Sequence, residues 1–319
     1  MTNINRVVLV THRGVLRISH FYVNNCLQLL ERTGMKRIEN QTLVGERALF
    51  SSGDIAVVDS VFCDGESPLK ESRNIEICSC RFEWKYPLWY CRGVRVTDCY
   101  LSPTARSGIW YTQGLSMSNC KIDAPKTFRR CQGLTLSNVE LNSAQETLWN
   151  CIDVSLSSVY VRGDYFGMGT SSVVADGLRV EGNYIFDGGR DITVKNSRLI
   201  SKDAFWNTEN VTVIDSVIIG EYLGWNSKNL RLINCYIESD QGMCYIEDLE
   251  LDNCQVKDSP LSFEYSTVSA SFKSLGNVSI KNPISGIITV EGSPELIMEE
   301  ERVDISATEI RFITKDESI

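Results

Sequence analysis

The strongest constraint on this chain is a repeat with a period of about 19 residues. Short strings that alternate apolar and polar residues recur between residues 55 and 275, as in VTVIDSVI at 211, LRLINCYI at 230 and LELDNCQV at 249. Successive copies begin 19 to 21 residues apart. A unit this short cannot bury its apolar face alone, so successive units have to stack on one another. The repeat therefore predicts a solenoid.

The period also selects the class of solenoid. Nineteen residues fit neither pentapeptide nor hexapeptide coils, and the apolar spacing differs from that of leucine-rich repeats. We predict an all-β fold, a right-handed parallel β-helix solenoid of about twelve ~19-residue coils, over residues 35–267. Residues 268–319, where the period breaks up, are predicted to form a C-terminal β cap. Residues 1–34 lack the repeat and are interpreted as an N-terminal extension, such as a mis-called start would leave before Met35.

Two positions of the repeat predict local structure. The fifth position is polar and predicts a ladder of turn residues, formed by Asp59, Ser79, Asp98, Asn119, Asn138, Ser158, Gly177, Asn196, Asp215, Asn234 and Asn253. The sixth position is often cysteine, which we interpret as a column of small buried residues, namely Cys80, Cys99, Cys120, Cys235 and Cys254.

Composition narrows the classes of function. The net charge is −9 and no run of Lys or Arg occurs, so we expect neither nucleic acid nor an anionic membrane as a partner. We expect a soluble, cytoplasmic protein, because no apolar run approaches the ~18 residues that span a bilayer and no signal-peptide pattern opens the chain. Both histidines, His12 and His20, lie in the predicted extension, so residues 35–319 cannot form a Ser-His-Asp triad.

A second apolar block lies inside each period, and strand alternation predicts one side chain facing the core and the next facing solvent. The predicted inward column is Leu69, Leu88, Ile109, Phe128, Leu148, Phe166, Ile185, Phe205, Leu223 and Met243. The predicted outward column is Lys70, Trp89, Trp110, Arg129, Trp149, Gly167, Phe186, Trp206 and Gly224. Solvent-facing tryptophans beside charges are typical of a sugar-binding surface, because pyranose rings stack on indole faces. The alternative is that these rings serve packing.

A column of charges precedes the predicted inward column by two or three residues. Its basic half contains Lys85, Arg106 and Lys126, with Arg129 and Arg130 close by, and its acidic half contains Glu146, Asp164, Asp203 and Glu221. Like charges on neighbouring coils repel, so each half needs partners or shifted pKa values. Asp164, Asp203 and Glu221 could bind Ca²⁺. Asp164 and Asp203, two coils apart, could share acid and base catalysis. Salt bridges between neighbouring coils are the third possibility.

Several longer strings resemble those of one family. DGESPLKES (64–72), ARSGIWYT (105–112), APKTFRRC (124–131), SKDAFW (201–206) and GEYLGWNSKN (220–229) are similar to strings of the bacterial DUF3737 family of uncharacterised proteins. The resemblance covers essentially residues 35–300. It implies a right-handed parallel β-helix similar to pectate-lyase-like proteins, and a usual start near Met35. It implies no reaction and supplies no catalytic residues.

We therefore expect a protein that binds or acts on an anionic oligosaccharide, in the manner of a lyase or a glycoside hydrolase. The expected catalytic residues are Asp164, Asp203, Glu221, Arg106 and Lys126. The expected sugar-binding residues are Lys85, Trp89, Trp110, Arg129, Arg130, Trp149 and Trp206. Ca²⁺ is the cofactor that the three acidic residues suggest. The competing hypothesis is a non-catalytic solenoid, a binding or assembly scaffold whose columns serve packing.

Overall fold

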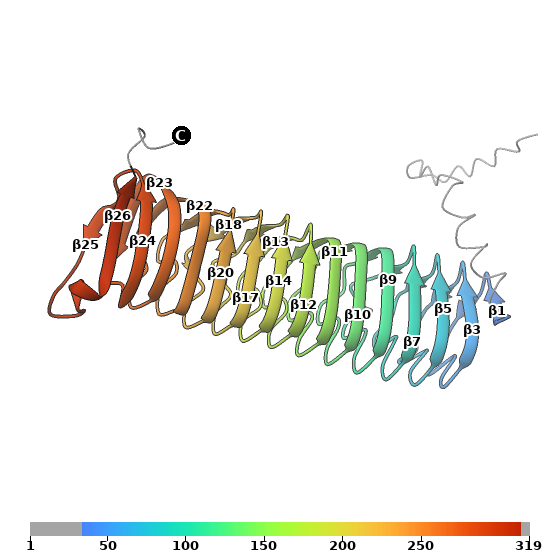
Figure 1. Cartoon of the computed structure of the whole chain (residues 1–319). Helices are drawn as coiled ribbons and strands as arrows, with labels where there is room; N and C mark the ends of the chain where they lie inside the picture. Colours follow the sequence, from blue (N-terminus) through green and yellow to red (C-terminus); the bar gives the residue numbers. More distant parts are fainter. Residues whose placement is uncertain (1–33, 314–319) are drawn as a thin grey trace, which may run out of the picture. The chain divides into compact units, whose positions relative to one another are not determined.

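Residues 34–313 are described by the computed structural model, and from Lys36 onward they wind into a solenoid (Figure 1). Each strand pairs in parallel with the strand one coil away. Val211, for example, lies beside Ile192 in the preceding coil and beside Leu230 in the following one. Equivalent positions of the repeat therefore lie next to each other in space. The fold is the predicted right-handed parallel β-helix.

The first side of the solenoid is a continuous parallel sheet. Its strands, in spatial order, are β1 (Lys36–Glu39), β3 (Gly53–Val58), β5 (Arg73–Cys78), β7 (Arg92–Thr97), β9 (Gln113–Ile122), β10 (Gln132–Leu141), β11 (Ile152–Arg162), β12 (Ser171–Asp176), β14 (Arg190–Lys195), β17 (Glu209–Ile214), β20 (Lys228–Ile233), β22 (Glu247–Ser262), β23 (Thr267–Lys281), β24 (Ser285–Glu291) and β26 (Thr308–Ile313).

The second side holds shorter strands that pair in the same way. They are β2 (Thr42–Leu43), β4 (Val61–Phe62), β6 (Arg81–Phe82), β8 (Tyr100–Leu101), β13 (Arg179–Glu181), β15 (Arg198–Ile200), β18 (Val217–Gly220), β21 (Tyr236–Ser239) and β25 (Glu295–Ile297). Long strands such as β9 and β10 continue from the first side into the second. The third side has little regular strand, apart from β16 (Asp203–Ala204) and β19 (Tyr222–Leu223).

The fifteen strands of the first side correct the predicted number of about twelve coils. The twelve repeats found in the sequence correspond to β3 through β23, and β1, β24 and β26 add three coils without that pattern. In the segment predicted as a cap, β23, β24 and β26 continue the parallel pairing. The predicted extension 1–34 lies outside the described residues except for Gly34. Within residues 34–313, no helix is long and apolar enough to cross a membrane.

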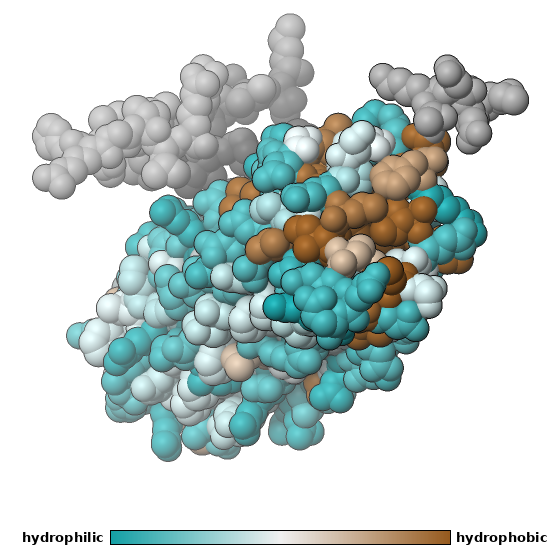
Figure 2. Space-filling model, turned by 90° about the vertical axis from the view of Figure 1, so that its left-hand side faces the viewer, coloured by the Kyte–Doolittle hydropathy of each residue, from teal (hydrophilic) through white to brown (hydrophobic). Residues whose placement is uncertain are grey.

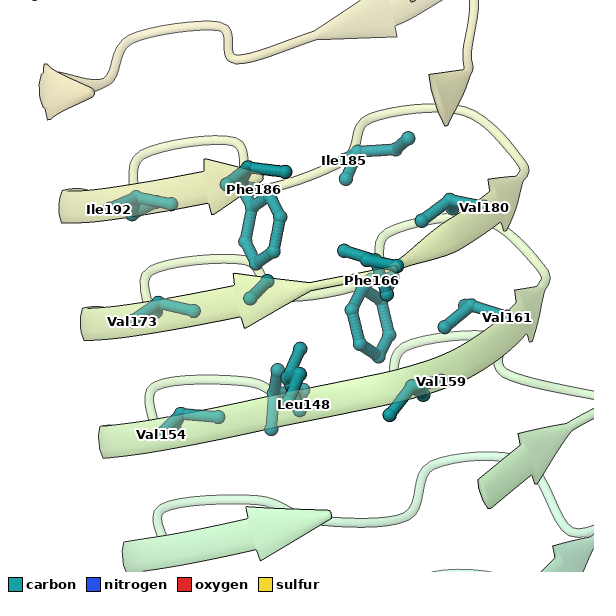
Figure 3. Packing of buried hydrophobic residues seen from close by; sticks show 14 of the residues in the cluster. Leu148, Val154, Val159, Val161, Phe166, Val173, Val180, Ile185, Phe186 and Ile192 are labelled. Atoms are coloured by element: carbon teal, nitrogen blue, oxygen red, sulfur yellow. The ribbon is translucent and has the colours of Figure 1, made fainter. Parts of the chain in front are cut away.

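Side chains from all three sides meet in one core along the solenoid. Every residue of the predicted inward column is buried, which confirms that prediction. Figure 3 shows Leu148, Phe166 and Phe186 from the third side directed toward valines of the first and second sides. Phe62 and Phe82, one coil apart, stack with ring centroids 4.6 Å apart. The core therefore also consists of columns of like residues.

The predicted turn ladder is confirmed, because each of its residues has a positive φ between the first and second sides. Asn, Asp and Gly adopt this left-handed conformation more readily than other residues do. Their side chains also bond along the axis. The Asn234 amide donates to Asp215 Oδ1 at 3.0 Å, and Asn253 donates to Asn234 Oδ1 at 2.9 Å. The ladder thus fixes the corner and links successive coils.

The cysteine column is confirmed as a set of small buried residues. The thiols of Cys235 and Cys254 donate to backbone carbonyl groups of the preceding coil. At Cys91, in another interior column, burial raises the thiol pKa to about 12. Such a thiol stays protonated at neutral pH and is a poor nucleophile. The Cys91 side chain therefore serves packing.

We predict that Asn234→Ala lowers the free energy of unfolding by about 1–3 kcal/mol, because it removes two ladder hydrogen bonds and places alanine at a positive φ. Asn234→Gly removes the same bonds, but glycine adopts a positive φ without strain, so its loss of unfolding free energy should be smaller. Urea unfolding followed by circular dichroism measures both. Equal losses in the two variants would show that the backbone conformation contributes nothing.

Candidate functional site

The third side carries the predicted functional columns, and backbone hydrogen bonds between coils define their true register. We call the solvent-facing positions of this side the outer column. Its members, identified from the coil-to-coil hydrogen bonds beside them, are Lys70, Trp89, Trp110, Arg129, Trp149, Met168, Asp187, Trp206 and Trp225. All nine are partly exposed. The outward direction predicted for the four tryptophans Trp89, Trp110, Trp149 and Trp206 is therefore right.

Three predicted members of this column are wrong. Gly167, Phe186 and Gly224 are buried, and Met168, Asp187 and Trp225 take the outward positions instead. Phe186 has φ 59° and the two glycines also have positive φ values. A left-handed residue interrupts the extended backbone, so two consecutive side chains face the core and the alternation fails.

The N-terminal part of the outer column is a closed stack. The rings of Trp89 and Trp110 lie 5.0 Å apart and nearly parallel. The guanidinium group of Arg129 lies 4.8 Å from the Trp110 ring and 4.5 Å from the Trp149 ring. Both faces of Trp110 are thus covered by neighbouring coils. A pyranose ring cannot stack on a covered face, so Trp110 does not have the sugar-stacking geometry expected from the sequence.

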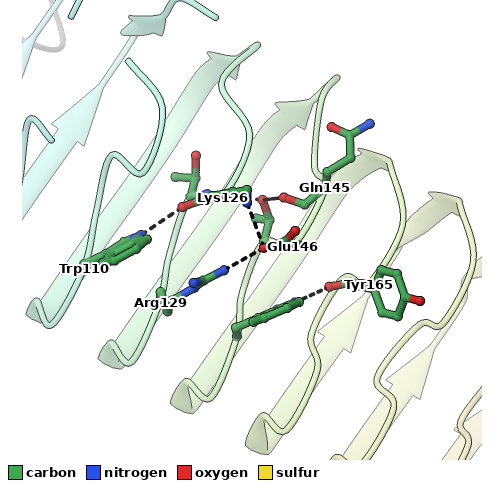
Figure 4. A network of polar contacts seen from close by, with 9 residues as sticks. Trp110, Lys126, Arg129, Gln145, Glu146 and Tyr165 are labelled. Atoms are coloured by element: carbon green, nitrogen blue, oxygen red, sulfur yellow. Dashed lines mark hydrogen bonds and ion pairs between the residues drawn. The ribbon is translucent and has the colours of Figure 1, made fainter. Parts of the chain in front are cut away.

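The indole N–H groups of this stack bond to the backbone of a following coil (Figure 4). Trp110 Nε1 donates to the Lys126 carbonyl at 2.9 Å, and Trp149 Nε1 donates to the Tyr165 carbonyl at 2.7 Å. Trp89 and Trp225 donate in the same way to Ser107 and Gln241. This recurring bond holds the rings against the solenoid, as packing side chains require.

Most charges predicted near the tryptophans form ion pairs between neighbouring coils. Lys85 pairs with Glu66 at 2.5 Å, and the bond to Glu66 raises the pKa of Lys85. Glu146 accepts from both Lys126 and Arg129 at 3.1 Å (Figure 4). The salt-bridge alternative is therefore right for these residues.

Two cations of the basic half have no ion pair within residues 34–313, namely Arg106 and Arg130. Arg106 is exposed. The Arg130 guanidinium group lies 5.9 Å from the centre of the Tyr111 ring. These two arginines are the groups of the basic half that remain open to an anionic ligand.

The structure does not bring together the three residues proposed for calcium. Asp164, Asn183, Lys202 and Glu221 follow one another along a column, linked by hydrogen bonds from coil to coil. Asp164 and Glu221 are thus three coils apart, or about 14 Å at the spacing of paired strands. Among residues 34–313, no three His, Cys, Asp or Glu side chains lie close enough to hold a metal ion. The calcium site predicted for Asp164, Asp203 and Glu221 is therefore wrong.

Asp203 differs from its equivalents in the other coils. Tyr184 and Tyr165, at the same position one and two coils earlier, have positive φ, whereas Asp203 and Tyr222 are extended and pair as β16 and β19. The extended backbone takes the Asp203 side chain into the protein, where the residue is 1% exposed. Its Oδ2 atom has no hydrogen-bond partner.

Trp206 lies in the same coil and lacks the bond that the other tryptophans of the outer column make. Its Nε1 atom is buried and has no partner, and Ser201 Oγ nearby in sequence also has none. Buried polar groups without partners are rare in folded proteins and cost about 1–3 kcal/mol each. A donor, an acceptor and a hydroxyl group are therefore all unsatisfied within six residues of the chain.

Aromatic side chains surround Trp206. Tyr184 and Tyr222 meet it edge-on, with ring centroids 6.0 and 6.1 Å away, and Trp225 stacks on it at 6.0 Å. We call Asp203, Trp206, Tyr184, Tyr222 and Trp225 the Asp203 site. The charge of Asp203 raises the pKa of the Tyr184 hydroxyl, so the two side chains lie close together.

The pKa of Asp203 lies above its ordinary value near 3.8. Burial is the main cause, since it disfavours the charged carboxylate, and the negative charges of Glu221 and Asp187 add to it. Lys202 opposes the shift, but its ammonium group is engaged with Glu221 at 3.4 Å. A buried acid with a raised pKa among aromatic rings is a physical indication of a functional site.

Sequence reasoning found Asp203, Trp206 and Glu221 but missed four neighbours, namely Tyr184, Asp187, Tyr222 and Trp225. The spacing of exactly one period between Trp206 and Trp225 was a usable signal, as was that between Tyr165, Tyr184, Asp203 and Tyr222. The burial of Asp203 had no such signal, because it depends on the local change of backbone conformation.

Comparison with known proteins identifies the family. A model for a family described as "Protein of unknown function (DUF3737)" matches residues 36–311. The chain belongs to this family. No curated protein sequence matches the chain.

Among solved structures, PfbA, a surface adhesin of Streptococcus pneumoniae, is 8% identical over 91% of this chain and 86% of its own, with a TM-score of 0.47. The A-module of the Azotobacter vinelandii mannuronan C-5 epimerase AlgE4 is 9% identical over 91% of this chain and 92% of its own, with a TM-score of 0.34. A tailspike protein mutant of E. coli bacteriophage HK620 is 9% identical over 91% and 74%, with a TM-score of 0.39. At these identities the likeness concerns the fold alone.

The raised pKa of Asp203 makes stability depend on pH. Because the folded-state pKa exceeds the unfolded one, the folded chain holds the proton more tightly between the two values. We predict that Asp203→Asn raises the free energy of unfolding at pH 7 by about 1.4 kcal/mol for each unit of that rise. The difference should vanish as the pH falls toward about 4. Urea unfolding between pH 4 and pH 8 measures it.

Asp164→Asn is the matched control, since Asp164 is an exposed carboxylate of the neighbouring column. Asparagine can still accept the hydrogen bond from the Asn183 N–H group, so Asp164→Asn should leave the free energy of unfolding at pH 7 close to that of the parent chain. A lower stability of Asp203→Asn at pH 7 would mean that the buried charge is stabilised by its surroundings, and would contradict the prediction.

Proposed function

We propose that this protein binds an oligosaccharide through the third side of the solenoid, with the Asp203 site at the centre of the contact. The observation that carries this proposal is the pair of buried, unpartnered atoms, Asp203 Oδ2 and Trp206 Nε1, beneath partly exposed aromatic rings. A sugar hydroxyl group can donate to the carboxylate and accept from the indole N–H. The same ligand would place its apolar ring surfaces against the tyrosine and tryptophan rings.

The site has to adjust before it can admit such a ligand. The two unpartnered atoms have almost no exposed surface, so a ligand reaches them only after a neighbouring side chain shifts. The ion pair between Lys202 and Glu221 is about half exposed on both sides. Exposed pairs contribute only about 0–1 kcal/mol, so this pair can open at little cost.

The charge around the site bears on the kind of sugar. Asp203, Asp187 and Glu221 lie near one another with Lys202 as the cation that acts on them. This surplus of negative charge favours a neutral sugar over a uronate at the Asp203 site. The anionic oligosaccharide expected from the sequence would instead use Arg106 and Arg130, several coils away. We therefore propose a neutral sugar at the Asp203 site itself.

A second candidate function is glycoside hydrolysis, and the raised pKa of Asp203 is the observation that favours it. A carboxyl group that stays protonated closer to neutral pH can act as a general acid toward the leaving oxygen. Under this proposal Asp203 is the acid. If the parent chain cleaves the oligosaccharide, and Asp203→Asn still binds it but no longer forms the cleavage product, the result would support hydrolysis beyond binding.

The test begins with the full chain on an array that holds neutral and uronate oligosaccharides, followed by calorimetry with the best binder. Trp206→Phe keeps an aromatic ring at this position but removes the unpartnered N–H donor, so we expect at least a tenfold weaker affinity. Asp203→Asn should weaken binding to a similar extent. Folding of each variant is checked by circular dichroism.

Tyr236→Phe is the control, because it removes a polar hydrogen from a partly exposed aromatic residue on the second side, where Tyr236 bonds to Glu238. It should bind as the parent chain does. Absence of binding to any sugar, or parent-like binding by both site variants, would favour the scaffold hypothesis instead.

A further inference from the structure

The C-terminal end of the solenoid exposes both an open strand edge and apolar side chains. Within residues 34–313, β26 pairs with β24 alone, so its other edge has no strand beside it. Figure 2 views this end and shows a continuous apolar area across it. Phe312 is 51% exposed, and Leu296 and Ile305 are also exposed. Open edges and large apolar patches are typical of interaction surfaces.

Phe312, Ile310 and Leu296 occupy positions that are buried in the preceding coils. Phe312 is the register partner of Val290, and Ile310 is the partner of Ile288, both of which are fully buried. Leu296 is likewise the partner of buried Ile280. Among residues 34–313, no further coil covers these core-facing side chains.

The charge pattern of β26 is self-complementary. Its sequence is Thr-Glu-Ile-Arg-Phe-Ile, so Glu309 and Arg311 lie on either side of Ile310. If two copies of β26 pair in antiparallel fashion with Ile310 opposite Ile310, Glu309 of each copy lies opposite Arg311 of the other. Opposite charges in such cross-strand pairs are favourable, and like charges are unfavourable.

We propose that β26 is an interface at which two copies of this chain join by a two-fold axis through Ile310. The sheet of the first side then continues from one copy into the next. Glu309 and Arg311 pair on the outer face, where each now bonds only to the other within its own strand at 2.8 Å. Thr308 faces Phe312 on the inner face, and the two apolar ends cover each other. Such an isologous contact closes on itself and leaves no open edge at β26.

Charge reversal tests the register. Either Glu309→Arg or Arg311→Glu places like charges opposite each other twice in the dimer, so each single variant should weaken dimerisation at least tenfold. The double variant, Glu309→Arg with Arg311→Glu, restores both cross-strand pairs and also the pair within the strand. It should dimerise within about threefold of the parent chain.

Analytical ultracentrifugation of the full chain at several concentrations measures the mass, and a dimer has twice the 35.9 kDa of one chain. Arg231→Glu, which breaks an exposed pair with Glu250 on β20 and β22, is the control and should leave dimerisation unchanged. A monomer at all concentrations, growth beyond two copies, equal dimerisation by the single variants, or no recovery in the double variant would each overturn the proposal.

Discussion

Parallel backbone hydrogen bonding between coils is the interaction on which the rest of this structure depends. It sets equivalent residues of successive repeats about 4.8 Å apart. The neighbours of each side chain are therefore the residues at the same repeat position in the preceding and following coils. Positions that tolerate a like neighbour become uniform columns, as the asparagine corner and the buried cysteines do. Positions that do not tolerate one must alternate. The pairs Lys85 with Glu66 and Lys126 with Glu146 are the result of that requirement.

The same spacing limits what an aromatic column can do. Flat rings 4.8 Å apart along the axis stack on one another, which covers the faces that a sugar would need. A tryptophan row along a β-helix is therefore a packing device wherever it is uninterrupted. The row changes at Met168 and Asp187 before Trp206, which is where we propose the sugar-binding site. The carbonyl group at the position that the other indoles use belongs, for Trp206, to Tyr222, which is extended in β19, and Trp206 Nε1 makes no bond to it.

The parts of the fold that the sequence could predict are those that repeat. Apolar periodicity placed the inward column correctly, and polar residues at the fifth position identified the left-handed corner. The errors come from positions where the residue type does not reveal the backbone. Phe186 is left-handed and buried although phenylalanine is not a turn residue, so alternation assigned it to the wrong side. Trp225 was missed because the outward position was assigned to Gly224. The burial of Asp203 likewise depends on the local strand β16. A strand of two residues is too short to leave a recognisable pattern in the sequence.

The ends of a solenoid differ from its interior, because the last member of each column has a neighbour on one side only. A chain can meet this with polar residues in the last coil, yet Ile310 and Phe312 stay apolar while their flanking charges alternate. The neighbours of Glu309 and Arg311 in the preceding coil are Ile287 and Thr289, which are uncharged. The opposite charges of β26 therefore form no ion pair with the preceding coil. Their alternation does serve an antiparallel neighbour of the same sequence. The charge pattern of the final strand is thus accounted for by the rule that governs the interior columns, applied across a two-fold axis.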